Sequence, residues 1–328
     1  MSSPIPTPHT PWTRSAGIAV ALAAVVTIVV LAFLWPSVTA NVRDIPIAVA
    51  GPSVQTAAIE AALNKQSPGT FAFTTVSDRA AAVKLIEERK DYGAIVLGAP
   101  PEVLTASAAN PTIAQLLGEV APKLQAKTTD VVPLASTDPR GSTIGASSFP
   151  MVLGGILGGA VIAVVVVGVW RRVLALGVYA IVGSAAITGV LQGWFGGLLN
   201  DYFVNAGAIA LVLVGIGGTM LGLAALIGTP GIALGPVLFL LGANPISGAA
   251  LPVEFYVSPW GAVGQWFPPG AGATLLRDLS YFPKADMALP WLVLTGWAVL
   301  GLLLSMLGHF RNAGAASREA ELEAASAA

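Results

Sequence analysis

Two adjacent charges, Arg277 and Asp278, stand in a part of the chain that is otherwise apolar and aromatic. Charged groups that leave water need partners, because burying an unpaired charge is costly. Two roles are open for this pair. It could act as a gate or lipid-headgroup contact on a transport pathway, or as a salt link that orients the segment. Of the two, we expect the salt link.

A second candidate is the carboxylate pair Glu87 and Glu88, which is followed directly by Arg89 and Lys90. Adjacent positions of a helix do not share a face, so the two carboxylates cannot converge on one substrate. The run of charges therefore predicts a solvated helix face rather than a general acid and base.

The sequence lacks the common catalytic motifs. It has no cysteine, and its two histidines, His9 and His309, lie in a tail and at the edge of an apolar run. Thiolate chemistry and a histidine-rich metal site are thereby excluded. No Gly-Lys dipeptide occurs, so a phosphate-binding loop for ATP is excluded, and no G-x-S-x-G, H-E-x-x-H or G-x-G-x-x-G motif is found in a suitable place. We therefore expect the protein to have no catalytic residue, to bind no cofactor and not to be an enzyme.

Arg277 and Asp278 belong to a stretch, residues 251–282, that is rich in proline and aromatic residues. The apolar run before it, 231–242, contains Pro236 and is shorter than the about 20 residues that a spanning helix needs. Aromatic rings favour the membrane–water boundary, and broken helix at membrane depth persists only where it packs in protein or lines a cavity. We predict a re-entrant or interfacial segment at about 243–286, the alternative being a proline-rich surface loop. Its candidate pathway residues are Pro252, Pro268, Pro269, Gly270, Arg277 and Phe282.

The composition is that of a membrane protein. Hydrophobic residues make up 55% of the 328 residues and charged residues only 10%, where soluble domains carry roughly 25% charged residues. A net charge of −1 gives no reason to expect a nucleic-acid partner. The first apolar run, 16–34, follows a polar tail and is longer than the core of a signal peptide. We favour a retained signal anchor over a signal peptide cleaved near Ala40.

Residues 43–147 differ in character, because they hold nine of the sixteen Lys and Arg residues and ten of the seventeen acids. Alternation of β-branched segments with amphipathic ones predicts an α/β domain with a mainly parallel sheet. Ser53, and Ser77 or Asp78, are expected to cap two of its helices. The predicted strands are 45–50, 70–76, 92–98 and 129–134, and the predicted helices are 53–65, 79–90 and 111–127.

The rest of the chain is predicted to span the membrane five more times, at about 149–169, 174–194, 205–228, 231–243 and 288–308. None of these runs contains Asp, Glu, Lys or Arg, which argues against a proton-driven carrier. Glycines at helix-packing spacing, such as Gly155/Gly159 and Gly218/Gly222, predict close helix contacts rather than a glycine-lined pathway.

The cations outside the apolar runs predict the orientation. Placing Arg14, Arg171, Arg172, Arg311 and Arg318 in the cytoplasm puts both termini inside and the α/β domain outside. The predicted layout is a cytoplasmic tail (1–15), a first span (16–35), an extracellular α/β domain (43–147), a five-span membrane domain (148–309) and a cytoplasmic tail (310–328). The fold class is thus an α-helical integral membrane protein of six spans, the fifth short or re-entrant, with an extracellular α/β domain between spans 1 and 2.

Several segments resemble those of the permease subunits of type-2 ABC exporters, and more closely the phage-infection-protein-like family of bacterial membrane proteins. These segments are SDRAAAVKLIEERKDYGAIVLG (77–98), VVPLASTDPRG (131–141, with Asp138 and Arg140), NPISG (244–248) and PPGAGATLLRDLSYF (268–282). The resemblance covers about residues 16–310.

The resemblance implies a multi-pass protein of the bacterial plasma membrane that forms a homodimer and couples to a separate cytoplasmic ATPase subunit. In such exporters a cytoplasmic helix between the second and third spans contacts the ATPase. The corresponding link in this sequence is residues 170–173, so Arg171 and Arg172 are the candidate coupling residues.

Two functions follow as hypotheses. The first is an export permease for a lipophilic or envelope-related molecule. The second is a non-transporting envelope receptor, sensor or scaffold that acts through the α/β domain. Co-purification of an ATPase distinguishes the first, and ligand or partner binding by the α/β domain distinguishes the second.

Overall fold

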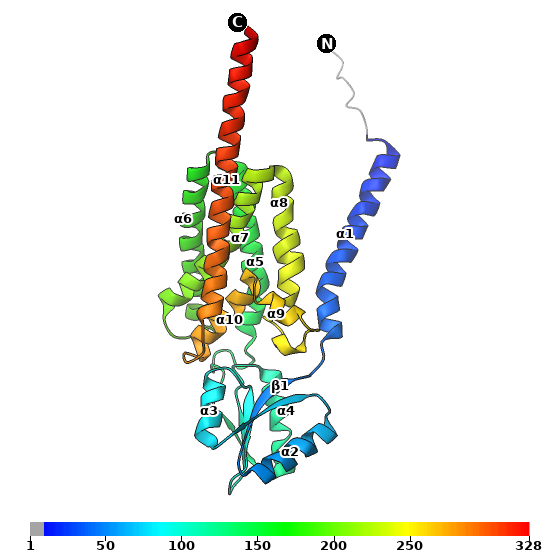
Figure 1. The fold of residues 1–328 in the computed structure, drawn as a ribbon, viewed down its shortest axis with the longest axis vertical. Helices are drawn as coiled ribbons and strands as arrows, with labels where there is room; N and C mark the ends of the chain where they lie inside the picture. The colour runs from blue at the N-terminus through cyan, green and yellow to red at the C-terminus, as the bar shows by residue number, and fades with distance from the viewer. Residues whose placement is uncertain (1–9, 328) are drawn as a thin grey trace.

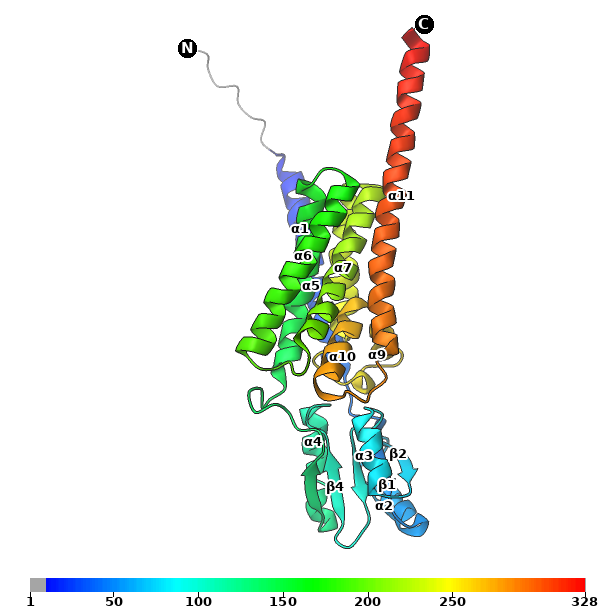
Figure 2. The same ribbon diagram turned by 90° about the vertical axis from the view of Figure 1, so that its left-hand side faces the viewer.

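The computed structural model describes residues 10–327, and their side chains as far as Arg311. Most of the predicted N-terminal tail, His9 and the side chain of Arg318 therefore lie outside the described part. Figure 1 shows an α/β unit at one end of the molecule and a helix bundle above it. The N-terminal end of α1 and the C-terminal helix lie at the opposite end from the α/β unit (Figure 1 and Figure 2).

Six helices are long and apolar enough to cross a membrane, as the sequence predicts. Length and composition therefore identify a multi-pass membrane protein. The six are α1 (Trp12–Thr39), α5 (Ser142–Val165), α6 (Val169–Thr188) with the π-helical η2 (Gly189–Trp194), α7 (Tyr202–Ile227), the joined run α8 (Thr229–Gly235), η3 (Pro236–Ala243) and η4 (Asn244–Ile246), and the first part of α11 (Ala288–Ala327).

The fifth of these helices is longer than the sequence predicts. The apolar run 231–243 was expected to be short, whereas the helical run covers the 18 residues Thr229–Ile246. Pro236 has no N–H to donate, and the helix accommodates it by widening into the π-helical turns of η3. At 1.5 Å per residue the run reaches about 27 Å, close to the thickness of a hydrocarbon core.

Helix α7 lies at the centre of the bundle, and 61% of its most apolar window is buried. A Cβ atom added to Gly222 would lie 2.4 Å from the Cβ of Leu304 on α11, and one added to Gly159 of α5 would lie 2.8 Å from the Cα of Gly217. Only glycine permits these backbones to approach so closely. The close contacts predicted at the Gly155/Gly159 and Gly218/Gly222 pairs are therefore confirmed.

Helix α1 stands apart from the bundle. None of its most apolar window is buried, and Figure 1 shows it leaning away from α8 toward its N-terminal end. Its contacts lie near its C-terminal end, where the Phe33 ring meets Phe149 of α5 at 6.1 Å and the Trp35 ring meets Trp260 at 6.5 Å.

The α/β unit is a five-stranded sheet in the order β2-β1-β3-β4-β5. Its buried core joins the sheet to α4, and includes Ile45 and Ile47 of β1, Ile95 of β3, and Ile113 and Leu117 of α4. The sheet is parallel except between β3 and β4, so the prediction of a mainly parallel sheet holds. Its elements are β1 (Ile45–Ala50), α2 (Ser53–Gln66), β2 (Phe71–Val76), α3 (Arg79–Glu87), β3 (Gly93–Val96), β4 (Glu102–Thr105), α4 (Pro111–Gly118), η1 (Ala121–Leu124) and β5 (Lys127–Asp130).

Three details of this unit differ from prediction. Strand β4 was not predicted, because it is only four residues long and follows two prolines. The helix expected at 111–127 ends at Gly118 and gives way to the short 3-10 helix η1, because Pro122 cannot donate the next backbone bond. The last strand was expected at 129–134 but is Lys127–Asp130.

Helix caps agree with prediction at one of the two places. Asp78 accepts a hydrogen bond from the Ala81 amide at 2.8 Å and begins α3. Ser53 does not cap α2, since the cap position is Pro52 and no side chain bonds there.

Candidate functional site

The boundary between the α/β unit and the bundle is built around α10 (Pro268–Tyr281). Pro268 and Pro269 occupy its first positions, where a missing N–H costs nothing and the fixed φ suits a helix start. Both prolines and Gly270 are buried, and a Cβ on Gly270 would lie 2.2 Å from the carbonyl oxygen of Gly264 in α9 (Trp260–Gly264). The sequence analysis names Pro268, Pro269 and Gly270 as candidate pathway residues. In the structure they are buried at the start of α10, which packs against α9, α7 and α11.

A buried ion pair joins the two parts of the molecule across this boundary. Nη1 of Arg89, at the end of α3, lies 2.6 Å from Oδ1 of Asp278, and the side chains are 19% and 4% exposed. The Arg89 guanidinium also lies 5.9 Å from the ring centroid of Phe282, within cation–π range. Each of the two charges is thus paired with a residue that lies 189 positions away in the sequence.

Three further contacts surround this pair. The Tyr92 hydroxyl donates to Glu254 at 2.8 Å, and Lys284 Nζ lies 2.7 Å from a Glu87 oxygen. Arg43 donates to the backbone carbonyl of Tyr256. The apolar core is also continuous here, because Ile86 of α3 and Phe282 belong to one buried cluster. We call Glu87, Arg89, Tyr92, Glu254, Asp278 and Lys284 the boundary cluster.

The salt link expected between Arg277 and Asp278 is wrong, since Asp278 pairs with Arg89 instead. Neighbouring helical side chains point in different directions, and the Arg277 side chain makes no hydrogen bond or ion pair with any described residue. Burial, and then the charge of Arg89, lowers the pKa of Arg277 to about 10. It remains a cation at neutral pH.

The expectation that residues 87–90 form a solvated face is also wrong in part. Glu88 and Lys90 do pair with each other at the surface, at 2.7 Å. Glu87 and Arg89 instead contact the bundle. Arg89 has a φ of 56°, so the helix ends there and turns its side chain toward α10. Pairing between distant segments leaves no periodic signal in a sequence, which is why Arg89, Tyr92 and Glu254 were missed.

Asp138 holds the start of α5. Its carboxylate accepts hydrogen bonds from the Ser142 and Thr143 amides at 3.0 and 2.9 Å. Burial alone would raise the pKa of Asp138, but these bonds outweigh it and lower the pKa below its usual value. Arg140 is exposed and has no ion pair with a described residue. Pro252 is buried and begins the short helix η5 (Val253–Phe255).

The two candidate coupling residues lie in the first turn of α6 rather than in a link. The link itself is residues 166–168, between α5 and α6. Arg172 donates to the carbonyl oxygens of Val166 and Ala163, each at 2.7 Å, and so closes the C-terminal end of α5. Arg171 is exposed at the same end of the bundle.

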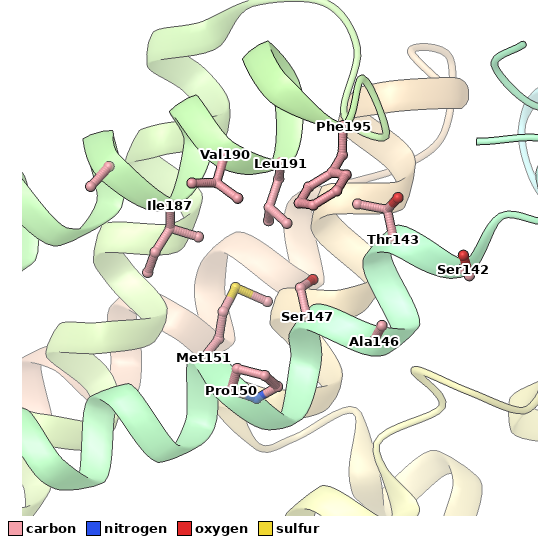
Figure 3. A pocket seen from close by; sticks show the side chains of 11 residues that line it. Ser142, Thr143, Ala146, Ser147, Pro150, Met151, Ile187, Val190, Leu191 and Phe195 are labelled. Atoms are coloured by element: carbon pink, nitrogen blue, oxygen red, sulfur yellow. The ribbon is translucent and has the colours of Figure 1, made fainter. Parts of the chain in front are cut away.

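A cavity of about 590 Å³ lies between the first turns of α5 and the end of α6 (Figure 3). Its walls are apolar and include Pro150, Met151 and Leu191. Hydroxyl groups of Ser142, Thr143 and Ser147 lie at one end. The π-helical turn η2 supplies Val190 and Leu191, so the widened helix shapes the wall. Such a cavity suits a lipophilic molecule with a small polar end.

Metal-ligating side chains do not gather anywhere in residues 10–311, where no group of three His, Cys, Asp or Glu side chains is close enough to hold an ion. Comparison with known proteins gives no family assignment. No known family model matches the chain, and no curated protein matches it.

Proposed function

We propose that this protein is the membrane subunit of an ABC-type exporter that moves a lipophilic or envelope-related substrate, with ATP hydrolysed by a separate partner. The observation that carries the proposal is the apolar cavity of about 590 Å³ with its hydroxyl groups at one end. It lies between α5 and α6 at the side of the bundle, and Asp138 accepts a hydrogen bond from the Ser142 amide at its rim. A chain without a phosphate-binding loop needs a partner to supply the energy.

The proposed orientation places both termini in the cytoplasm and the α/β unit outside. Arg14 near the start of α1, Arg171 and Arg172 at the start of α6, and Arg311 near the end of the last span support it. These segments gather at the end of the bundle opposite to the α/β unit (Figure 1), and cationic residues favour the cytoplasmic side. In this orientation α9 and α10 form the re-entrant segment on the outer side.

The proposed surface for the ATPase is the cytoplasmic end of α5 and α6. Arg172 is engaged in closing α5, so Arg171 is the cation that remains available there. The contact area would be small, because the α5–α6 link has three residues, 166–168.

The test is affinity purification of the full-length protein from its host in mild detergent, with mass spectrometry of its partners. We expect an ATPase in stoichiometric amount, and its loss in the Arg171→Glu variant. Arg140→Glu, an exposed charge reversal at the other end of the bundle, is the matched control and should retain the partner. Intact protein that never carries an ATPase would contradict the proposal.

The second candidate function is an envelope receptor or scaffold that acts through the α/β unit. The shortness of the α5–α6 link favours it, since little of the chain is available there to receive force from an ATPase. Replacing Ala146, which lines the cavity, by Trp separates the two functions. Filling the cavity should abolish export but leave a receptor function unchanged. Deletion of residues 45–130, which spares Asp138 and the start of α5, should do the reverse.

A further inference from the structure

A groove of about 680 Å³ lies between the last turns of α5 and the first turns of α6, at the end of the bundle opposite to the α/β unit (Figure 1). Its walls are apolar and face outward, because the side chains of Leu157, Val161, Leu174 and Val178 are exposed. The apolar outer surface of a membrane-spanning bundle lies against lipid. The groove therefore opens toward the hydrocarbon chains of the membrane.

The floor of the groove is closed by Tyr179. Its hydroxyl donates to the carbonyl oxygen of Gly154 at 2.8 Å. A Cβ on Gly158 would lie 2.4 Å from its ring, so the ring rests directly on the backbone of α5. Behind it, Ile162 and Leu176 belong to a buried apolar cluster. The groove shares no lining residue with the cavity of Figure 3, and it leads outward to lipid rather than into the bundle.

The length of the groove matches one leaflet of a bilayer. Its lining on α6 runs from Arg171 to Tyr179, a rise of about 12 Å at 1.5 Å per residue. One leaflet supplies roughly 15 Å of a hydrocarbon core that is about 30 Å thick. The groove thus fits most of one acyl chain and ends near the middle of the membrane.

A single cation stands at the outer end of the groove. Arg171 is exposed, and it is the only charged residue among the described residues that line the groove. Its neighbour Arg172 is engaged by the carbonyl oxygens of Val166 and Ala163, whereas the Arg171 side chain has no hydrogen bond or ion pair with a described residue. A guanidinium binds a phosphate through two parallel hydrogen bonds. Charge complementarity therefore selects an anionic headgroup.

We propose that this groove binds an anionic phospholipid of the surrounding membrane, with one acyl chain between α5 and α6 and its phosphate at Arg171. Basic positions between spanning helices at headgroup level are typical sites for such lipids. The occupant is a resident lipid rather than a transported one, because the groove opens to the bilayer and its floor is closed. The proposal does not depend on transport. A guanidinium has five N–H donors, so a phosphate at Arg171 leaves donors for a partner protein.

The test uses the full-length protein in phosphatidylcholine nanodiscs that contain a trace of one of two photo-crosslinkable probes. One is a phosphatidylglycerol with a diazirine in its acyl chain, and the other is a phosphatidylcholine with the same chain. We expect the phosphatidylglycerol probe to label peptides of α5 and α6 about tenfold more than the phosphatidylcholine probe, and unlabelled phosphatidylglycerol to compete. Equal labelling by both probes would show an unspecific lipid annulus and overturn the proposal, as would labelling spread evenly over all six spans.

The first variant removes the charge. Arg171→Gln should lower labelling of α5 and α6 by phosphatidylglycerol about tenfold, which is what the loss of one charge-assisted contact allows, and leave labelling by phosphatidylcholine unchanged. Arg14→Gln, the same exchange at an exposed position at the start of α1, is the matched control and should keep the preference for phosphatidylglycerol.

The second variant fills the groove without touching the cation. Val161→Trp should lower labelling of α5 and α6 by phosphatidylglycerol, because the ring occupies the place of the acyl chain. Val299→Trp, the same exchange at an exposed position of α11, is its control and should have no effect. Both exchanged residues are exposed, so the thermal unfolding midpoint should stay the same. Unchanged labelling in both Arg171→Gln and Val161→Trp would overturn the proposal.

The lipid site and the ATPase contact are tested separately. The nanodiscs contain no other protein, so the labelling result does not depend on an ATPase. Val161→Trp keeps Arg171 and should co-purify with the ATPase as the wild type does, whereas Arg171→Glu should lose it. Absence of an ATPase from the wild type would contradict the proposed function alone, and absence of a preference for phosphatidylglycerol would contradict the lipid site alone.

Discussion

The ion pair of Arg89 and Asp278 is the residue-scale feature that ties the α/β unit to the bundle. The two side chains are largely withdrawn from water and lie 2.6 Å apart. A buried pair adds little over an apolar contact, but removal of one partner leaves an isolated charge and is costly.

We therefore predict that Arg89→Met and Asp278→Leu each destabilise the protein by about 3 kcal/mol, and that the double variant recovers part of this loss. The thermal unfolding midpoint of the full-length protein in one detergent measures the effect. Arg79→Met is the control, because its pair with Glu102 leaves the arginine side chain 50% exposed and such surface pairs contribute about 0–1 kcal/mol. Additive effects of the two single variants would contradict the pairing.

Asp91 introduces a pH dependence in the α/β unit. It is 4% exposed and its Oδ2 has no hydrogen bond to a described residue, and burial raises its pKa to about 6. A folded-state pKa above the unfolded value means that the folded protein binds the proton more tightly. The contribution of Asp91 is therefore unfavourable at neutral pH and is relieved as the pH falls from about 6 toward 4.

We predict that Asp91→Asn stabilises the protein at pH 7 by on the order of 2 kcal/mol and by much less at pH 4. Unfolding midpoints of the variant and the wild type across this pH range provide the measurement. Parallel curves, with the same difference at every pH, would contradict the assignment to Asp91.

At the scale of the elements, features set by residues close together in the sequence could be predicted. Features set by contacts between distant segments could not. Asp78 caps α3 because the cap and its amide are three residues apart, and strand β1 matches its predicted bounds because it is a continuous apolar run. The partner of Asp278 was not predictable, since Arg89 lies in another part of the fold. Strand β5 was misplaced because its position is fixed by pairing with β4, which the sequence did not reveal.

Helix packing in the bundle depends on glycine contacts that were visible in the sequence. A Cβ on Gly222 would lie 2.4 Å from the Cβ of Leu304 and 2.9 Å from the carbonyl oxygen of Gly301, so the backbones of α7 and α11 must separate to accept it. We predict that Gly222→Val lowers the unfolding midpoint strongly, at a cost of several kcal/mol. Gly296→Val, where a Cβ meets nothing within 4 Å, is the control on α11 and should have little effect. Equal midpoints for the two variants would contradict this account.

At the scale of the whole molecule, the chain without cysteine allows a direct measurement of orientation. We predict that Val54→Cys, at an exposed position of α2, reacts with a membrane-impermeant maleimide in intact cells. Arg171→Cys, at the opposite end of the bundle, should react only after the membrane is permeabilised. The wild type provides the background, and the reverse pattern of labelling would place the α/β unit in the cytoplasm.

The last helix has a length that exceeds its span. Its apolar part ends near Arg311, and the helix continues to Ala327. The sixteen residues beyond the span add about 24 Å of rigid rise, more than the depth of a headgroup layer. The C-terminal end of α11 therefore lies beyond the lipid headgroups. A fusion partner or antibody attached there would reach it without touching lipid, and immobilisation through this end would leave both faces of the membrane domain unobstructed.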